Sequence, residues 1–188
     1  MSGTADITVL ATGGTIDKVY TLAGELEIGP PAAQRLLEVL RTELRIVVHS
    51  VIGKDSLDIT DDDRQALADA VDQLDTSSVV ITHGTDTLSD TAVYLSRHRP
   101  EASRTVVLTG SLQPAAMTVS DAALNLGAAL MASQTLAPGV YVCMGGRAFS
   151  AGQVRKDALT GQFVSTSPAG VPRPAGPGSP PPTKAPPG

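Results

Sequence analysis

Residues 6–16 read DITVLATGGTI, and this stretch indicates the fold of the whole chain. Its first seven residues are mostly apolar and β-branched, which favours a strand buried on both faces of a sheet. The strand pattern stops at Gly13 and Gly14, because a glycine pair lets the backbone turn with positive φ. Thr15 follows directly. We therefore predict a buried strand whose carboxyl end presents a glycine-rich turn and a hydroxyl group.

Four further apolar runs resemble the first, and helical patterns separate them. The runs are residues 44–52, 79–82, 105–109 and 140–144. Apolar side chains recur at helical spacing in four intervening segments, residues 32–42, 62–74, 86–97 and 121–133. Strands that alternate with helices build βαβ units, which pair into a parallel sheet covered on both faces. The sequence therefore predicts an α/β protein with a parallel-sheet, Rossmann/flavodoxin-like three-layer domain.

The distribution of proline divides the chain into two parts. The 188 residues contain 14 prolines, and nine of these lie in residues 168–188 together with four glycines. Such a segment donates few backbone hydrogen bonds and buries little apolar surface, so we expect a disordered tail with polyproline II character. Residues 1–167 have an ordinary length for one domain. We predict one catalytic domain in residues 1–167 and a tail in residues 168–188.

Composition narrows the class of function. The formal net charge is −5 and the chain holds three Tyr, two Phe and no Trp, which argues against a nucleic-acid binder with a basic stripe and stacking platforms. No apolar run reaches the roughly 18 residues of a membrane span, and we expect no secretory signal. The single cysteine, Cys143, forms no intrachain disulfide. We expect a cytoplasmic protein without nucleic-acid or membrane partners.

Glycines and hydroxyl side chains recur where the predicted strands end. The first turn contains Gly14 and Thr15, and a later one contains Gly84 and Thr85. Ligands bind outside the carboxyl ends of the strands in an open parallel sheet, so a site is expected at these turns. A threonine hydroxyl beside exposed backbone N–H groups has the parts of a nucleophile and an oxyanion hole. Turns shaped by glycine for geometry alone are the alternative, and the nucleotide-binding motifs GxGxxG and GxxxxGK[ST] are absent.

Two motifs together are more specific than either alone. Residues 11–16 read ATGGTI and residues 81–87 read ITHGTDT, each at the end of a predicted strand. With this combination the chain resembles the bacterial-type L-asparaginases, which include asparaginase–glutaminases. The resemblance extends over about residues 7–164. It is supported by three further stretches, which are residues 55–58 (DSLD), residues 109–111 (TGS) with Asn125, and residues 152–156 (GQVRK).

The resemblance implies an activity and the residues that carry it. Such enzymes hydrolyse the side-chain amide of L-asparagine, and L-glutamine as a second substrate, through an acyl-threonine. They need no metal or other cofactor, and the usual dimer of dimers leads us to expect a homodimer or homotetramer. The residues expected in catalysis are Thr15 as nucleophile, Tyr20 on the loop that covers the site, and a hydrogen-bonded triad of Thr85, Asp86 and Lys156. Those expected to bind substrate are Ser56, Asp55, Gly14 and Gly84.

Chemistry supports these roles and leaves some choices open. Threonine is a weak nucleophile that needs a base, and a lysine serves only where burial and neighbouring groups lower its pKa. Thr15 and Thr85 are both suited to take the acyl group, and the choice of Thr15 follows the family. Asp86 also suits the start of a helix as an N-cap. His83 is expected in hydrogen-bonded packing rather than in catalysis, and Cys143 as a small buried hydrophobe.

The chain departs from long family members in two features. Those members have a smaller C-terminal domain that contributes an acidic residue to the neighbouring subunit's site, whereas residues 168–188 contain no Asp or Glu. Tyr20 also lies only five residues after Thr15. We therefore expect a short-chain form of the enzyme. Two alternatives stay open, a non-catalytic small-molecule-binding or interaction module of the same fold and an ammonia-supplying subunit of an amidotransferase.

Overall fold

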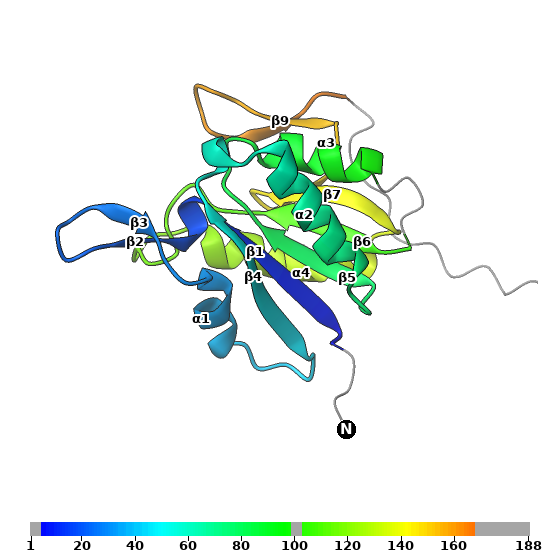
Figure 1. Ribbon diagram of the computed structural model, residues 1–188, viewed down its shortest axis with the longest axis horizontal. Coiled ribbons are helices and arrows are strands. Elements are labelled where there is room, and N and C mark those ends of the chain that lie inside the picture. Colours follow the sequence, from blue (N-terminus) through cyan, green and yellow to red (C-terminus); the bar gives the residue numbers. More distant parts are fainter. Residues whose placement is uncertain (1–4, 99–102, 168–188) are drawn as a thin grey trace, which may run out of the picture.

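A six-stranded sheet forms the centre of the computed structural model, which describes residues 5–98 and 103–167 (Figure 1). Its order is β4-β1-β5-β6-β7-β8, and every neighbouring pair is parallel except β7 with β8. The parallel strands follow the flavodoxin-like order, which confirms the predicted fold class. The strands are β1 (Ile7–Gly13), β4 (Ile46–Lys54), β5 (Ser78–Thr82), β6 (Thr105–Thr109), β7 (Gly139–Met144) and β8 (Arg147–Ser150).

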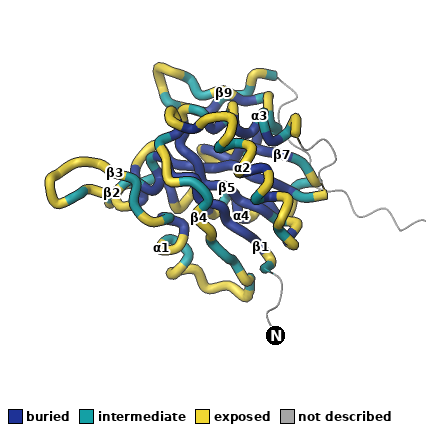
Figure 2. Tube along the Cα trace, in the orientation of Figure 1, coloured by how far each residue is buried: buried dark blue, intermediate teal, exposed yellow. Residues whose placement is uncertain are grey.

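Helices cover both faces of this sheet. Successive side chains of a strand point to opposite faces, and both faces carry apolar side chains that need to be buried. On β1, Leu10 belongs to the apolar cluster beneath helices α2 (Asp61–Asp72) and α3 (Leu88–His98). Val9 belongs instead to the cluster beneath α1 (Ala32–Glu38) and α4 (Ala122–Thr135). The result is the predicted three-layer arrangement, with the central strands buried (Figure 2). Within the described ranges, no helix is long and apolar enough to cross a bilayer.

Several short elements are not predicted from the sequence. Two one-turn 3-10 helices, η1 (Thr15–Asp17) and η2 (Ser56–Asp58), follow β1 and β4. The hairpin of β2 (Lys18–Tyr20) and β3 (Leu26–Ile28) projects from the body (Figure 1). A second hairpin, β9 (Val154–Lys156) with β10 (Phe163–Ser165), contacts α3. Each strand has only three residues, too few for a periodic pattern.

All four predicted helices differ from the observed ones by one or more residues at an end, and α1 differs most. The pattern in residues 32–42 predicts a helix through residue 42, but α1 ends at Glu38. At that end the N–H of Leu40 donates to the carbonyl of Leu37 at 3.0 Å, a tighter turn that closes the helix instead of continuing it. Helix α3 begins at Leu88 rather than at Asp86. The predicted tail, residues 168–188, lies outside the described residues.

The carboxyl ends of β1, β5 and β4 meet at two glycines. Gly14 has a φ of 80°, and a Cβ atom added to it would overlap the backbone of Gly84. A Cβ atom on Gly84 would in turn lie 2.6 Å from the Cβ of Ser56. Since β1 and β5 are the pair at which the strand order reverses, this contact lies at the switch point where ligands bind in such sheets.

We predict that Gly84→Ala lowers the free energy of unfolding by about 1–3 kcal/mol, because the methyl group overpacks the junction. Gly127→Ala is the control. A Cβ atom on Gly127 of α4 would have no neighbour within 4 Å, so alanine should stabilise its helix by roughly 0.5–1 kcal/mol. Urea denaturation of the three proteins measures both changes. Equal stability of Gly84→Ala and the parent chain would contradict the close contact.

Candidate active site

Lys156 joins two side chains of the turn that follows β5. Its Nζ donates hydrogen bonds to Oγ1 of Thr85 at 2.8 Å and to Oδ1 of Asp86 at 2.6 Å. Thr85 is buried, whereas the side chains of Lys156 and Asp86 are 25% and 49% exposed. The sequence-predicted triad is therefore assembled, with the carboxylate of Asp86 balancing the ammonium charge. The alternative role of Asp86 was to cap the start of a helix, but its carboxylate bonds to the Lys156 side chain.

The contact between Gly14 and Gly84 brings the turn that holds Thr15 next to the turn that holds Thr85. Thr15 opens η1 directly after Gly14, as Thr85 follows Gly84, and it is half-buried. Hydrogen bonds fix the turn on both sides of it. The N–H of Asp17 donates to the carbonyl of Gly14 at 3.1 Å, and the N–H of Ala115 donates to the carbonyl of Ile16 at 3.2 Å. The two candidate nucleophiles are thus presented from rigid, neighbouring strand ends.

Ser56 and Asp55 occupy the adjacent turn after β4. Ser56 is 1% exposed and packs against Gly84, and its carbonyl accepts a 2.7 Å hydrogen bond from the Thr87 hydroxyl. The Asp55 carboxylate lies 2.7 Å from Nζ of Lys18, and hydrogen bonding to Lys18 holds the pKa of Asp55 below its usual value. Ser56 therefore joins the junction, while Asp55 ties its turn to the β2–β3 hairpin. Their roles toward a substrate stay predictions.

Tyr20 lies apart from the triad. It ends β2 on the projecting hairpin, which Figure 2 shows as largely exposed, and the Tyr20 side chain is 63% exposed. The structure does not bring its ring into hydrogen-bonding contact with Thr85, Asp86 or Lys156. Its expected catalytic role stays a prediction.

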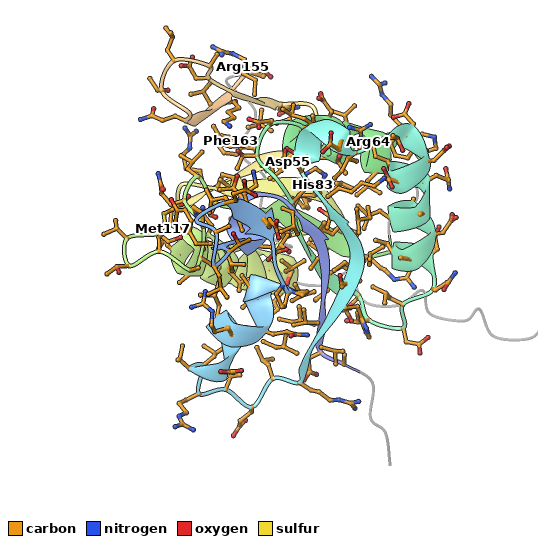
Figure 3. All side chains as sticks on the ribbon, turned by 60° about the vertical axis from the view of Figure 1, so that its left-hand side comes forward. Asp55, Arg64, His83, Met117, Arg155 and Phe163 are labelled. Atoms are coloured by element: carbon orange, nitrogen blue, oxygen red, sulfur yellow. The ribbon has the colours of Figure 1, made fainter. Side chains whose placement is uncertain are left out.

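His83 packs behind the site, as expected from the sequence. Burial lowers its pKa to about 4, so the ring is neutral at physiological pH. Its Nδ1 lies 2.8 Å from the carbonyl of Gly84 and its Nε2 lies 2.9 Å from Oγ1 of Thr91. Figure 3 shows His83 at the same end of the sheet as Asp55, with Arg155 on the outer hairpin.

Cys143 is buried too, which raises its pKa to about 11 and makes it a poor nucleophile.

Asp17 is a buried acid that sequence reasoning missed. It is 2% exposed, and its Oδ1 accepts a 2.7 Å hydrogen bond from the N–H of Ala32 at the start of α1. Its carbonyl accepts another from the N–H of Gly29. Burial raises the pKa of Asp17 to about 6 and outweighs the backbone hydrogen bonds, which lower it. The sequence feature that could have indicated this buried acid is its position directly after the apolar Ile16.

Neither a surface cavity nor a cluster of metal-binding side chains marks the candidate site. A cavity of about 230 Å³ is lined by Asp17, Lys18 and Arg35 among others, but Thr85 and Lys156 do not line it. The hydrogen-bonded group of Thr85, Asp86 and Lys156 therefore marks the candidate active site better than this cavity does. Among the described side chains, no group of three or more His, Cys, Asp or Glu residues is placed to hold a metal ion.

We predict that Asp17 makes the protein less stable as the pH rises from about 4 to about 6. An acid with a higher pKa in the folded chain keeps its proton longer when folded, so raising the pH favours the unfolded chain. A pKa of about 6 against 3.8 corresponds to about 3 kcal/mol, and the loss levels off above pH 6. Urea denaturation across this range should give a flatter profile for Asp17→Asn than for the parent chain. Glu27→Gln, at an exposed acid of β3, is the control, and an unchanged slope in Asp17→Asn would contradict the assignment.

Comparison with known proteins agrees with this arrangement. The family model described as asparaginase, N-terminal, matches residues 6–166. The L-asparaginase of Thermococcus kodakarensis is 36% identical over 145 residues, which are 71% of this chain and 42% of that protein. A probable periplasmic L-asparaginase of Haemophilus influenzae is 30% identical over 173 residues, 87% of this chain and 49% of that protein. The chain spans about half the length of the curated relatives it matches.

Solved structures share the fold. The thermostable L-asparaginase from Thermococcus kodakarensis superposes with a TM-score of 0.75 at 33% identity, over 85% of this chain and 50% of that one. The probable cytoplasmic L-asparaginase from Campylobacter jejuni gives a TM-score of 0.75 at 28% identity, over 86% of this chain and 53% of that one. Since sequence and fold agree over nearly all of the described residues, this chain belongs to the asparaginase family and corresponds to the family's N-terminal domain.

Proposed function

We propose that this chain is an amidohydrolase that converts L-asparagine to L-aspartate and ammonia without a metal, with L-glutamine as a second substrate. The observation that carries the proposal is the position of Lys156, whose Nζ bridges Thr85 and Asp86 beside the turn that holds Thr15. A nucleophile needs a group that moves its proton, and Lys156 with Thr85 supplies such a group at the turn next to the one that holds Thr15. We assign the catalytic unit to residues 1–167.

In the proposed reaction Thr15 Oγ1 attacks the amide carbon of the substrate. A C–O bond forms, the C–N bond breaks, and the proton lost by Thr15 ends on the departing nitrogen, which leaves as ammonia. The Thr85 hydroxyl with Lys156 behind it is suited to relay that proton, because Thr85 Oγ1 already accepts a hydrogen bond from Nζ. Backbone N–H groups of the glycine turns would stabilise the oxyanion. Water then cleaves the threonine ester and restores Thr15.

The charges at the junction suit a zwitterionic amino acid. Asp86 offers a half-exposed carboxylate for the substrate ammonium group, and Ser56 offers a hydroxyl for the substrate carboxylate. Gly14 and Gly84 let the backbone approach the ligand. We assign Tyr20 to the step that activates Thr15, on a hairpin that would have to fold over the site. A homodimer or homotetramer in the cytoplasm is part of the proposal, although the named relatives include both a cytoplasmic and a periplasmic protein.

We predict that the purified chain releases ammonia from L-asparagine and that Thr15→Ala abolishes the release. Lys156→Met should lower kcat by about 10²–10⁴-fold, because it removes the proton relay, with a smaller effect on KM. Arg155→Met is a matched control, since Arg155 precedes Lys156 on the same strand and its side chain pairs with Asp157. A coupled ammonia assay measures all four proteins.

The same assay separates the possible failures. No ammonia from the parent chain, with or without residues 168–188, would support the non-catalytic module instead. Near-normal turnover by Thr15→Ala would mean that Thr85 rather than Thr15 takes the acyl group, and Thr85→Val would then test this assignment. Equal kcat values for Lys156→Met and Arg155→Met would remove Lys156 from the mechanism.

A further inference from the structure

A continuous series of hydrogen bonds runs from the surface of α2 to the catalytic turn. Nε of Arg64 donates to Oγ1 of Thr91 at 3.1 Å, and the same oxygen lies 2.9 Å from Nε2 of His83. Nδ1 of His83 then lies 2.8 Å from the carbonyl oxygen of Gly84. We refer to Arg64, Thr91 and His83 as the Arg64 chain. None of its members belongs to the triad, yet it ends on the residue before Thr85.

Every hydrogen bond in the Arg64 chain has a defined direction. The Gly84 carbonyl can only accept, so Nδ1 of His83 carries the proton. Because the ring is neutral, Nε2 is an acceptor, and the Thr91 hydroxyl must donate to it. The same hydroxyl oxygen accepts from Arg64, which has no acceptor atom. The guanidinium charge therefore polarises each following bond in the same sense, which strengthens the series.

The end of the Arg64 chain sets the orientation of one peptide plane. The Gly84 carbonyl and the Thr85 N–H belong to the same trans peptide and point in opposite directions. A bond that holds the carbonyl toward His83 consequently holds the Thr85 N–H away from it. Gly84 packs against both Ser56 and Gly14, and glycine's conformational freedom at this position has to be restricted by its neighbours.

We propose that Arg64 is a remote positioning residue for the reaction, acting through Thr91 and His83 on the Gly84–Thr85 peptide. The inference rests on the proposed amidohydrolase function. Arg64 is 12% exposed, and its Nη1 pairs with the exposed Asp61 at 2.8 Å, which orients the guanidinium at the surface end. Figure 3 shows Arg64 on α2 near the end of the sheet that holds His83. Helix α2 thus serves the active site without supplying a group that touches substrate.

The first test compares two arginines that line the same surface pocket between α2 and α3. Arg64→Met keeps the aliphatic stem but removes the donor, and we expect kcat about tenfold lower with KM within about twofold, since small displacements of a catalytic group can cost up to about 100-fold. Arg97→Met, at the control position in that pocket, should leave both constants unchanged. Equal kcat values for the two variants would overturn the proposal.

A second set of variants tests the route through His83. His83→Asn keeps an N–H near the position of Nδ1 and should retain more activity than His83→Leu, which loses it. In the His83→Leu background, Arg64→Met should change kcat by less than about twofold, because the route is already interrupted. Independent, additive losses would overturn the proposal. Circular dichroism and thermal unfolding of each variant identify any loss of activity that follows from loss of the fold.

One readout does not depend on activity. In protein labelled with ¹⁵N-threonine, the Thr85 amide signal, assigned with Thr85→Ser, should shift in Arg64→Met and His83→Leu but not in Arg97→Met. If the parent chain releases no ammonia, the proposed function fails while this comparison still decides the coupling. An unshifted Thr85 signal in Arg64→Met would overturn the inference whether or not the chain is active.

Discussion

The contact between Gly14 and Gly84 is the constraint on which the site depends. It brings together the ends of two neighbouring parallel strands so closely that neither position has room for a side chain. Thr15 and Thr85 each follow one of these glycines directly, so they are placed at neighbouring turns for this reason, and Ser56 closes the junction from the turn after β4. The threonines therefore owe their geometry to backbone packing. Everything else in the site either supports these turns or approaches them from outside.

Burial divides the supporting groups into two kinds. Ser56, His83 and Asp17 are almost fully buried and are held by short hydrogen bonds, which cost free energy if one partner is removed. The Lys156–Asp86 pair is partly exposed, and such pairs add little to stability. Its value lies in the position of Nζ relative to the Thr85 hydroxyl. Residues that maintain the junction and residues that perform the proposed chemistry are thus largely different sets.

Sequence patterns predicted the five parallel strands because these strands form apolar runs, whereas the antiparallel edge strand β8 was not predicted. The triad was reached through a family resemblance, since a single lysine on a three-residue strand carries no signal of its own. The pattern missed the β2–β3 and β9–β10 hairpins for the same reason. It extended α1 four residues too far because Leu40 continues the apolar spacing after the helix has ended at Glu38. Asp17 and the Arg64 chain were also missed. Their significance depends on which backbone groups they meet, and spacing along the sequence does not encode those contacts.

The hairpin that carries Lys156 has a consequence for folding. The bond between Lys156 and Thr85 joins residues 71 positions apart, and β9 and β10 are held to the body chiefly by Val154 and Phe163, which enter the core beneath α3. During synthesis the two threonines leave the ribosome before this lysine, so the group cannot be complete until the hairpin has been made. A chain whose sheet is complete but whose hairpin is undocked would have nearly native circular dichroism and an incomplete catalytic group. Recovery of the proposed activity during refolding would therefore report the docking of the hairpin rather than the formation of the sheet.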